Sequence, residues 1–131
     1  MRRNVAPPGR GVLIDYASWA EKRGIKYTTF SSHQIKLGDI LNIAEECNIT
    51  FKRGDILLVR IGLTKEWEND MGVEEKKAYA ATQSPKHAGV EGTMDMLKWV
   101  WNTGFAAVGG DAISWEVCLP RVPLNVLAGW I

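Results

Sequence analysis

The chain has 131 residues, of which 46% are hydrophobic, and its 16 lysines and arginines nearly balance 15 aspartates and glutamates. This length and apolar content fit one modest globular domain spanning residues 1–131. A net charge of +1 excludes a large electropositive surface, and no apolar run approaches the roughly 20 residues that cross a bilayer, so we expect no nucleic-acid or membrane partner and a cytoplasmic location.

The first predicted elements are a strand and a short helix. The apolar run Gly11–Asp15 ends in a carboxylate, which predicts a strand closed by a capping residue. The next segment, Tyr16–Lys22, favours a helix that stops at Gly24. Residues 25–35 are rich in β-branched, aromatic and small polar side chains, which predicts strand and loop.

A longer helix and a buried strand are predicted next. Apolar residues recur at helical spacing after Asp39, with glutamates on the other side, which predicts an amphipathic helix with Asp39 as its N-cap. These apolar residues are Ile40, Leu41, Ile43, Ala44 and Cys47. Residues 56–59 form a continuous apolar run too short for a helix, which is typical of a central strand buried on both faces.

The second half of the chain predicts a charged arm, a helix and a further strand. Residues 65–81 carry alternating charges, which favours solvated helices interrupted near Gly72. Apolar side chains at steps of four, three and four predict a helix that ends at Gly104, and residues 105–108 predict a second buried strand. The members of this stripe are Val90, Met94, Leu97 and Trp101. The alternation of strands and helices indicates the α/β class.

Histidines and cysteines form no metal or disulfide motif in the sequence. His33 and His87 are separated by several predicted elements, so a shared metal site would depend wholly on folding. His87 and Glu91 are four residues apart, but we place a helix start between them, and the helix dipole explains Glu91 there. Cys47 and Cys118 are too few and too far apart for a disulfide framework, which predicts two buried, reduced thiols.

Two polar residues at strand ends are candidate site residues. Asp111 follows an apolar strand and two glycines, at the kind of position where open α/β sheets bind ligands. A loop cap is an equally good interpretation of the same carboxylate. Arg60 follows the other buried strand and is suited either to an anionic substrate or, as we favour, to pairing with a nearby carboxylate.

Several blocks of the sequence together resemble the cyclase and kynurenine formamidase family, a family of metal-dependent hydrolases. The blocks are residues 9–15, 54–62, 89–91, 99–102 and 105–111, and their order and spacing match as well. The resemblance extends over nearly the whole chain and is greatest to the branch of the family found in fungi.

The resemblance implies a fold and a chemistry. The family is similar in fold to a swivelling β/β/α domain, and its members include kynurenine formamidases of tryptophan catabolism and isatin hydrolases. It therefore implies hydrolysis of a small arylformamide or cyclic amide, of the type that converts N-formylkynurenine to kynurenine and formate. A zinc or manganese ion is expected in a complete member of the family.

The metal-binding residues of the family have no counterparts in this sequence. The main ligand motif, His-x-Gly-Thr-His-x-Asp, precedes the block that resembles residues 9–15. A later histidine and glutamate are not found around residues 123–130. We therefore expect an incomplete β/β/α domain, without the N-terminal metal-motif segment and the C-terminal end, that holds no metal and is inactive as this chain. No catalytic residue is assigned, and Arg60 and Asp111 are expected in supporting positions near the substrate.

An alternative function is that of a non-catalytic interaction protein. Such a pseudoenzyme would use its retained α/β surface to pair with a partner or a full-length relative, and a homo-oligomer is a further option. Exposure of Trp99 or Trp101 would favour this alternative.

Overall fold

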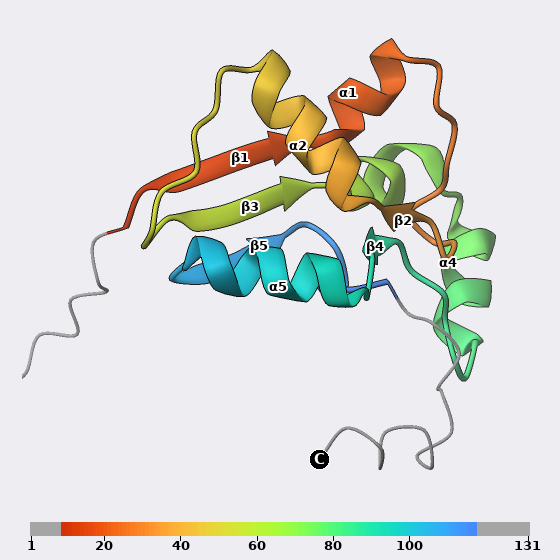
Figure 1. The fold of residues 1–131 in the computed structure, drawn as a ribbon. Helices are drawn as coiled ribbons and strands as arrows, with labels where there is room; N and C mark the ends of the chain where they lie inside the picture. Colours follow the sequence, from red (N-terminus) through yellow and green to blue (C-terminus); the bar gives the residue numbers. More distant parts are fainter. Residues whose placement is uncertain (1–8, 118–131) are drawn as a thin grey trace, which may run out of the picture.

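The computed structural model describes residues 9–117, which form a mixed α/β arrangement of parallel strands and helices (Figure 1). The main sheet has the strand order β1-β3-β5, and β2 pairs with β4 in a second, two-stranded sheet. The strands are β1 (Gly11–Asp15), β2 (Gln34–Ile35), β3 (Ile56–Arg60), β4 (Gly89–Val90) and β5 (Ala107–Gly110). All pairings of these strands are parallel. The α/β class is confirmed.

The first strand and the first helix lie where the sequence predicts them. Helix α1 (Tyr16–Lys22) follows β1 directly, and Asp15 is its N-cap because the backbone N–H of Ser18 donates to its carboxylate at 3.1 Å. The chain leaves the helix through Gly24, whose φ of +67° lies in the region that favours glycine. Of the strand predicted within residues 25–35, only β2 forms.

Helix α2 (Leu37–Glu46) begins three residues earlier than predicted. Its N-cap is Lys36, so Asp39 was wrongly placed as the capping residue. Asp39 instead lies in the first turn and accepts a hydrogen bond from the backbone N–H of Lys36 at 3.3 Å. The prediction of a buried thiol was wrong for Cys47, which is exposed at the end of α2. Cys118 and residues 123–130 lie outside the described residues.

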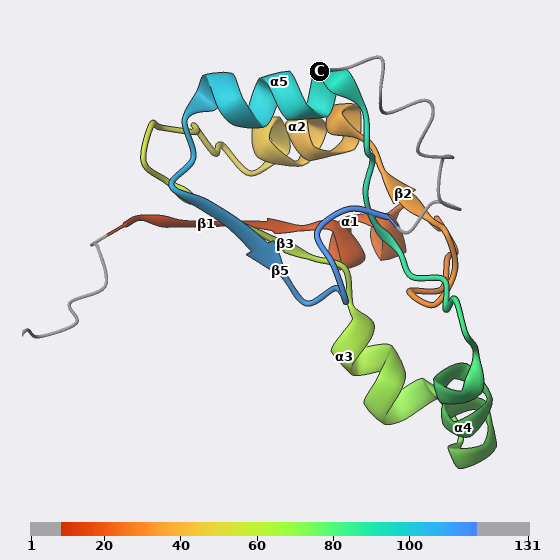
Figure 2. The same cartoon turned by 90° about the horizontal axis from the view of Figure 1, so that it is seen from below.

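The charged segment forms an arm of short helices, as predicted. The arm consists of α3 (Leu63–Lys65), the π-helix η1 (Glu66–Asp70) and α4 (Val73–Ala81). Gly72 separates η1 from α4, and these three helices contain no buried residue. Figure 2 shows the arm extending away from the main sheet.

The last helix is shorter than predicted because Val90 is not part of it. Helix α5 (Met94–Thr103) ends at Gly104, which adopts a φ of +73°. Val90 lies in β4 and is fully buried. Its step of four to Met94 therefore matched the helical period by coincidence. Glu91 does lie at a helix start, but at that of α2, where it accepts from the backbone N–H of Leu37 at 2.9 Å.

Among the described residues, helices cover only one face of the main sheet. Val12, Ile14, Leu57 and Val59 point to the covered face and are buried. Figure 2 shows α2 and α5 together on that side, and no helix within residues 9–117 lies over the other side of the three strands. The prediction that residues 56–59 are buried on both faces was therefore wrong, because Leu58 alternates with Leu57 and points to the uncovered side.

The predicted second buried strand is also corrected. Strand β5 begins at Ala107 rather than Phe105, and it is largely exposed. It lies at the edge of the three-stranded sheet, with β3 as its neighbour on one side. Within the described part of the chain, no helix is long and apolar enough to span a membrane.

Candidate functional site

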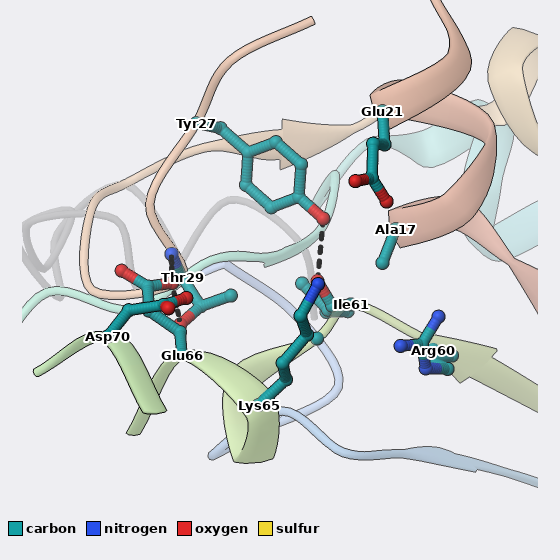
Figure 3. A pocket seen from close by; sticks show the side chains of 10 residues that line it. Ala17, Glu21, Tyr27, Thr29, Arg60, Ile61, Lys65, Glu66 and Asp70 are labelled. Carbon is teal, nitrogen blue, oxygen red and sulfur yellow. Dashed lines mark hydrogen bonds between the residues drawn. The ribbon is translucent and has the colours of Figure 1, made fainter. Parts of the chain in front are cut away.

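A cleft of about 270 Å³ lies beyond the carboxyl ends of β1 and β3 (Figure 3). Its walls come from α1, the loop before β2, the end of β3 and the arm. The lining residues are Ala17, Glu21, Tyr27, Thr29, Arg60, Ile61, Gly62, Lys65, Glu66 and Asp70. Its position agrees with the rule that open parallel sheets bind ligands outside the carboxyl ends of their strands.

Arg60 is held in an ion pair at the edge of this cleft. Its guanidinium donates to the Asp15 carboxylate at 2.7 Å and to the Ser18 hydroxyl at 3.2 Å. Burial alone would raise the pKa of Asp15, but hydrogen bonds from Ser18 and Arg60 outweigh it and hold that pKa below its ordinary value. The structural pairing that the sequence favoured for Arg60 is therefore present, and a role toward substrate stays a prediction.

Asp111 anchors the turn that leads from β3 into α3. Its two carboxylate oxygens accept from the backbone N–H groups of Ile61 and Gly62 at 2.6 and 2.9 Å. Gly62 has a φ of +94°, so the turn itself requires a residue without a side chain. The carboxylate thus works as a loop anchor. Its predicted position near a substrate is not contradicted, because this turn lines the cleft.

The far wall of the cleft depends on Glu66, which the sequence did not reveal as a functional position. Its carboxylate accepts from the backbone N–H and the hydroxyl of Thr29 at 2.7 and 2.6 Å, and from the hydroxyl of Thr28. The Tyr27 hydroxyl donates to the Ile61 carbonyl at 2.6 Å, and burial raises the pKa of Tyr27. These bonds fasten the arm and the end of β3 to the loop before β2.

The two histidines lie in separate hydrogen-bonded clusters. His33 Nε2 is 2.8 Å from the Tyr16 hydroxyl, and its ring stacks on Tyr27 at 4.4 Å between centroids. Burial lowers the pKa of His33, which favours the neutral imidazole, and burial raises the pKa of Tyr16 to about 12. His87 Nε2 is 2.6 Å from the Ser114 hydroxyl. The structure does not bring His33 and His87 into one site.

The described residues do not fit a divalent metal ion. Within residues 9–117 no group of three histidine, cysteine, aspartate or glutamate side chains lies close enough to hold one. In the cleft, the Glu66 carboxylate is already bonded to Thr28 and Thr29, and that of Asp111 to backbone N–H groups. A catalytic zinc site needs about three protein ligands, so these residues alone cannot form one.

The fold and the cleft define a class: an α/β protein with its candidate site at the carboxyl ends of parallel strands. A family model described as "Putative cyclase" matches residues 7–117, and the chain belongs to this cyclase family. No curated protein matches the sequence.

A solved structure is similar in fold. The crystal structure described as that of "a novel cyclase" has 23% sequence identity to this chain and a TM-score of 0.67. The match covers 89% of this chain and 35% of that protein, so this chain spans about a third of the length of its structural relative.

The cleft shows what a sequence pattern can and cannot reveal. Arg60 and Asp111 were found because each follows a strand, and parallel strands bring such positions to one edge. Glu66 meets Thr29 across 37 positions of sequence. Glu66 also lies in the arm, and the alternating charges of that segment predicted only solvent-exposed helices. The threonine pair at 28 and 29 was the one available signal, since hydroxyls there suit a bond to an acceptor.

Proposed function

We propose that this chain is part of a metal-dependent amide hydrolase of the cyclase family, and that it does not turn over substrate alone. The ancestral reaction would be hydrolysis of an arylformamide or cyclic amide, of the N-formylkynurenine type. The observation that carries the proposal is the family match over residues 7–117, combined with the lack of a three-ligand cluster within residues 9–117. Zinc or manganese would thus need ligands from beyond the described residues.

The role we propose for the cleft is to support a substrate rather than to transform it. The Arg60 guanidinium keeps a partly exposed face at the cleft, although one of its nitrogens is bound to Asp15. It would supply a positive charge beside an anionic group of the substrate. Asp111 would act indirectly, by fixing the Ile61–Gly62 backbone that forms the floor of the cleft.

We propose further that the described residues form part of a swivelling β/β/α domain. The support is the one-sided covering of the main sheet, with α2 and α5 on one face and the other face uncovered by residues 9–117 (Figure 2). A β/β/α arrangement has one helical layer and a second sheet, which would occupy the uncovered face.

The test measures metal content and turnover of the purified chain together. The chain is incubated with zinc or manganese, desalted, analysed for bound metal, and assayed with N-formylkynurenine. We expect neither stoichiometric metal nor formate release above the rate in buffer. Tight stoichiometric metal with turnover would overturn the inactive assignment, and His33→Ala and His87→Ala would then show whether either histidine is a ligand.

A second candidate function, the non-catalytic interaction protein, is supported by one observation. Trp101 is 82% exposed on α5, whereas Trp99 packs against Phe51 and Phe105. Large exposed aromatic side chains are enriched at the centres of protein interfaces. The test is titration with a full-length cyclase-family protein. A shift in tryptophan emission that Trp101→Ala removes would support this function, and no shift at saturating concentration would contradict it.

A further inference from the structure

The arm is tied to the rest of the described residues at both of its ends. Before its first helix, the Asp111 carboxylate holds the backbone of the Ile61–Gly62 turn through hydrogen bonds of 2.6 and 2.9 Å. After its last helix, the backbone N–H of Ala88 donates to the Thr29 carbonyl at 2.8 Å. Residues 63–86 therefore lie between two fixed points of the chain, and the arm is a flap rather than a loose tail.

Between these two points the arm adds nothing to the hydrophobic core. None of its three helices contains a buried residue. Figure 2 shows the arm beyond the carboxyl end of β3, away from the main sheet. Segments with few buried apolar contacts open locally at a small cost in free energy, while the rest of the fold stays intact. By this criterion the arm can open while the two sheets remain folded.

The hydrogen bonds that join the arm to the loop before β2 converge on one carboxylate. Glu66 accepts from the Thr28 hydroxyl, and from the backbone N–H and the hydroxyl of Thr29 at 2.7 and 2.6 Å. Thr29 is 2% exposed, so the loop side of this contact is fixed in the core. Phe30 of the same loop adds an edge-to-face contact with Tyr79 of α4. Glu66 thus joins a segment without buried residues to a buried one.

The carboxylate of Glu66 is also part of the wall of the cleft. Lys65, Glu66 and Asp70 line the cleft from the arm, and Ala17 lines it from α1 (Figure 3). Glu66 and Asp70 are the first and last residues of η1. Short π-helical segments are rare and occur frequently at functional sites. Movement of the arm would therefore change how far the cleft is open to a ligand.

We propose that the arm is a movable lid of the cleft and that Glu66 is its latch. With the three bonds of Glu66 in place, the lid is closed and forms one wall of the cleft. Breaking these bonds releases the arm and widens the entrance. The inference rests on the proposed function, because a lid serves a cleft that binds a substrate. The opening itself requires neither metal nor turnover.

The test measures access to the cleft through the reactivity of a thiol. Ala17→Cys, at a partly buried position of the cleft, is introduced into the whole chain with Cys47→Ser and Cys118→Ser. Its rate of reaction with a water-soluble maleimide is followed by mass spectrometry. Glu66→Ala should raise this rate at least ~10-fold, because the loss of even one hydrogen bond to a charged group shifts an equilibrium by about that factor.

Matched variants control the measurement. Glu68→Ala removes an exposed glutamate of the same π-helix and should leave the rate unchanged. Thr29→Val removes one donor to the latch at constant size and should raise the rate less than Glu66→Ala does. It serves as the test if Glu66→Ala does not fold. Leu97→Cys, at a 56% exposed position of α5, should react equally fast with and without the latch. Circular dichroism establishes that each variant is folded.

Three outcomes would overturn the inference. An unchanged rate in folded Glu66→Ala would mean that this carboxylate does not hold the lid. An equal increase in Glu68→Ala would mean that any change in the arm loosens it. If Ala17→Cys already reacts as fast as Leu97→Cys when Glu66 is intact, the arm does not restrict the cleft. These results are independent of the metal and formate measurements, so failure of the lid and failure of the proposed function are distinguishable.

Discussion

An ion pair joins β1 to β3 at each end of the two strands. The arginine is on the β1 side at the amino end and on the β3 side at the carboxyl end. At the amino end, Arg10 before β1 binds Asp55 before β3 through two bonds of 2.9 and 2.6 Å. At the carboxyl end, Asp15 of β1 binds Arg60 of β3 through a single nitrogen. The Asp55 side chain is 3% exposed, whereas those of Asp15 and Arg60 are each 38% exposed.

This difference in side-chain exposure distinguishes the amino end of the strand pair, where the carboxylate is buried, from the carboxyl end, which is open to solvent. Asp55 also accepts from the backbone N–H of Lys52 at 2.7 Å, so both of its carboxylate oxygens have donors. The pair at the carboxyl end shares its surroundings with the cleft and keeps part of its surface in solvent. In parallel α/β sheets, ligands bind at the carboxyl end, and the two ion pairs reflect that division.

The largest expected effect comes from the strand between the two ends. Leu57→Ala removes a fully buried side chain and should lower the free energy of unfolding by about 3 kcal/mol. Leu58→Ala removes its neighbour from the uncovered side of the sheet, where Leu58 is partly exposed, and should change the unfolding free energy by less than ~1 kcal/mol. Urea denaturation at low protein concentration measures both. Equal losses would mean that the two faces are equally covered.

At the carboxyl end, Asp111→Ala should be the most destabilising change to a polar residue. It leaves the backbone N–H groups of Ile61 and Gly62 without their acceptor, which costs about 1–3 kcal/mol. Asp70→Ala, an exposed aspartate of the same cleft, is the control and should be nearly neutral. A neutral Asp111→Ala would show that the turn does not depend on this anchor.

Acid should weaken the amino end of the pair. The bonds from Arg10 lower the pKa of Asp55 to about 2, below the roughly 3.9 of an unfolded aspartate. Between these values the unfolded state binds more protons, so stability falls as the pH falls from about 4 to 2. Thermal unfolding should be measured at several pH values. The midpoint temperature should depend less on pH in the Asp55→Asn variant than in the wild type. If Asp15→Asn reduces the pH dependence of the midpoint temperature more than Asp55→Asn does, Asp55 is not the main source of the acid sensitivity.

The smallest effect is expected for Arg60→Lys. Partly exposed ion pairs contribute about 0–1 kcal/mol, and lysine keeps the charge. The unfolding free energy should thus stay within ~1 kcal/mol of the wild type. In a complete, active relative the same change should raise KM more than it lowers kcat, if the guanidinium binds substrate. A change in kcat alone would contradict a role in substrate binding.

Elements with a local signal could be predicted from the sequence, and elements set by distant contacts could not. Gly11–Asp15 and Tyr16–Lys22 were predicted with their bounds, because Asp15 caps the helix and Gly24 follows it. Val90 was misplaced because its partner Ile35 in β2 lies far away in sequence. The exposure of β5 depends on which distant elements pack against it, and no local pattern encodes such contacts.

The site residues at the strand ends could be predicted from the sequence. The contacts between the elements that form the walls of the cleft could not. Arg60 and Asp111 were found from their position after apolar strands, although the partners of each became visible only in the structure. The pairing of Asp15 with Arg60 follows from the β1–β3 register, in which the two residues are opposite each other. The contacts of Glu66 and Tyr27 depend on how the arm folds back, and this geometry has no periodic signature.

The parallel direction of every described strand pair has a consequence for the order of folding. No pair can form as a hairpin, so each strand must wait for a partner that lies tens of residues away. Such non-local pairings slow folding. During synthesis β3 must leave the ribosome before β1 can pair, and β5 is added later still. The nascent chain therefore carries unpaired apolar strands for longer than a helical or hairpin-rich protein of equal length, and it should benefit most from chaperones during that interval.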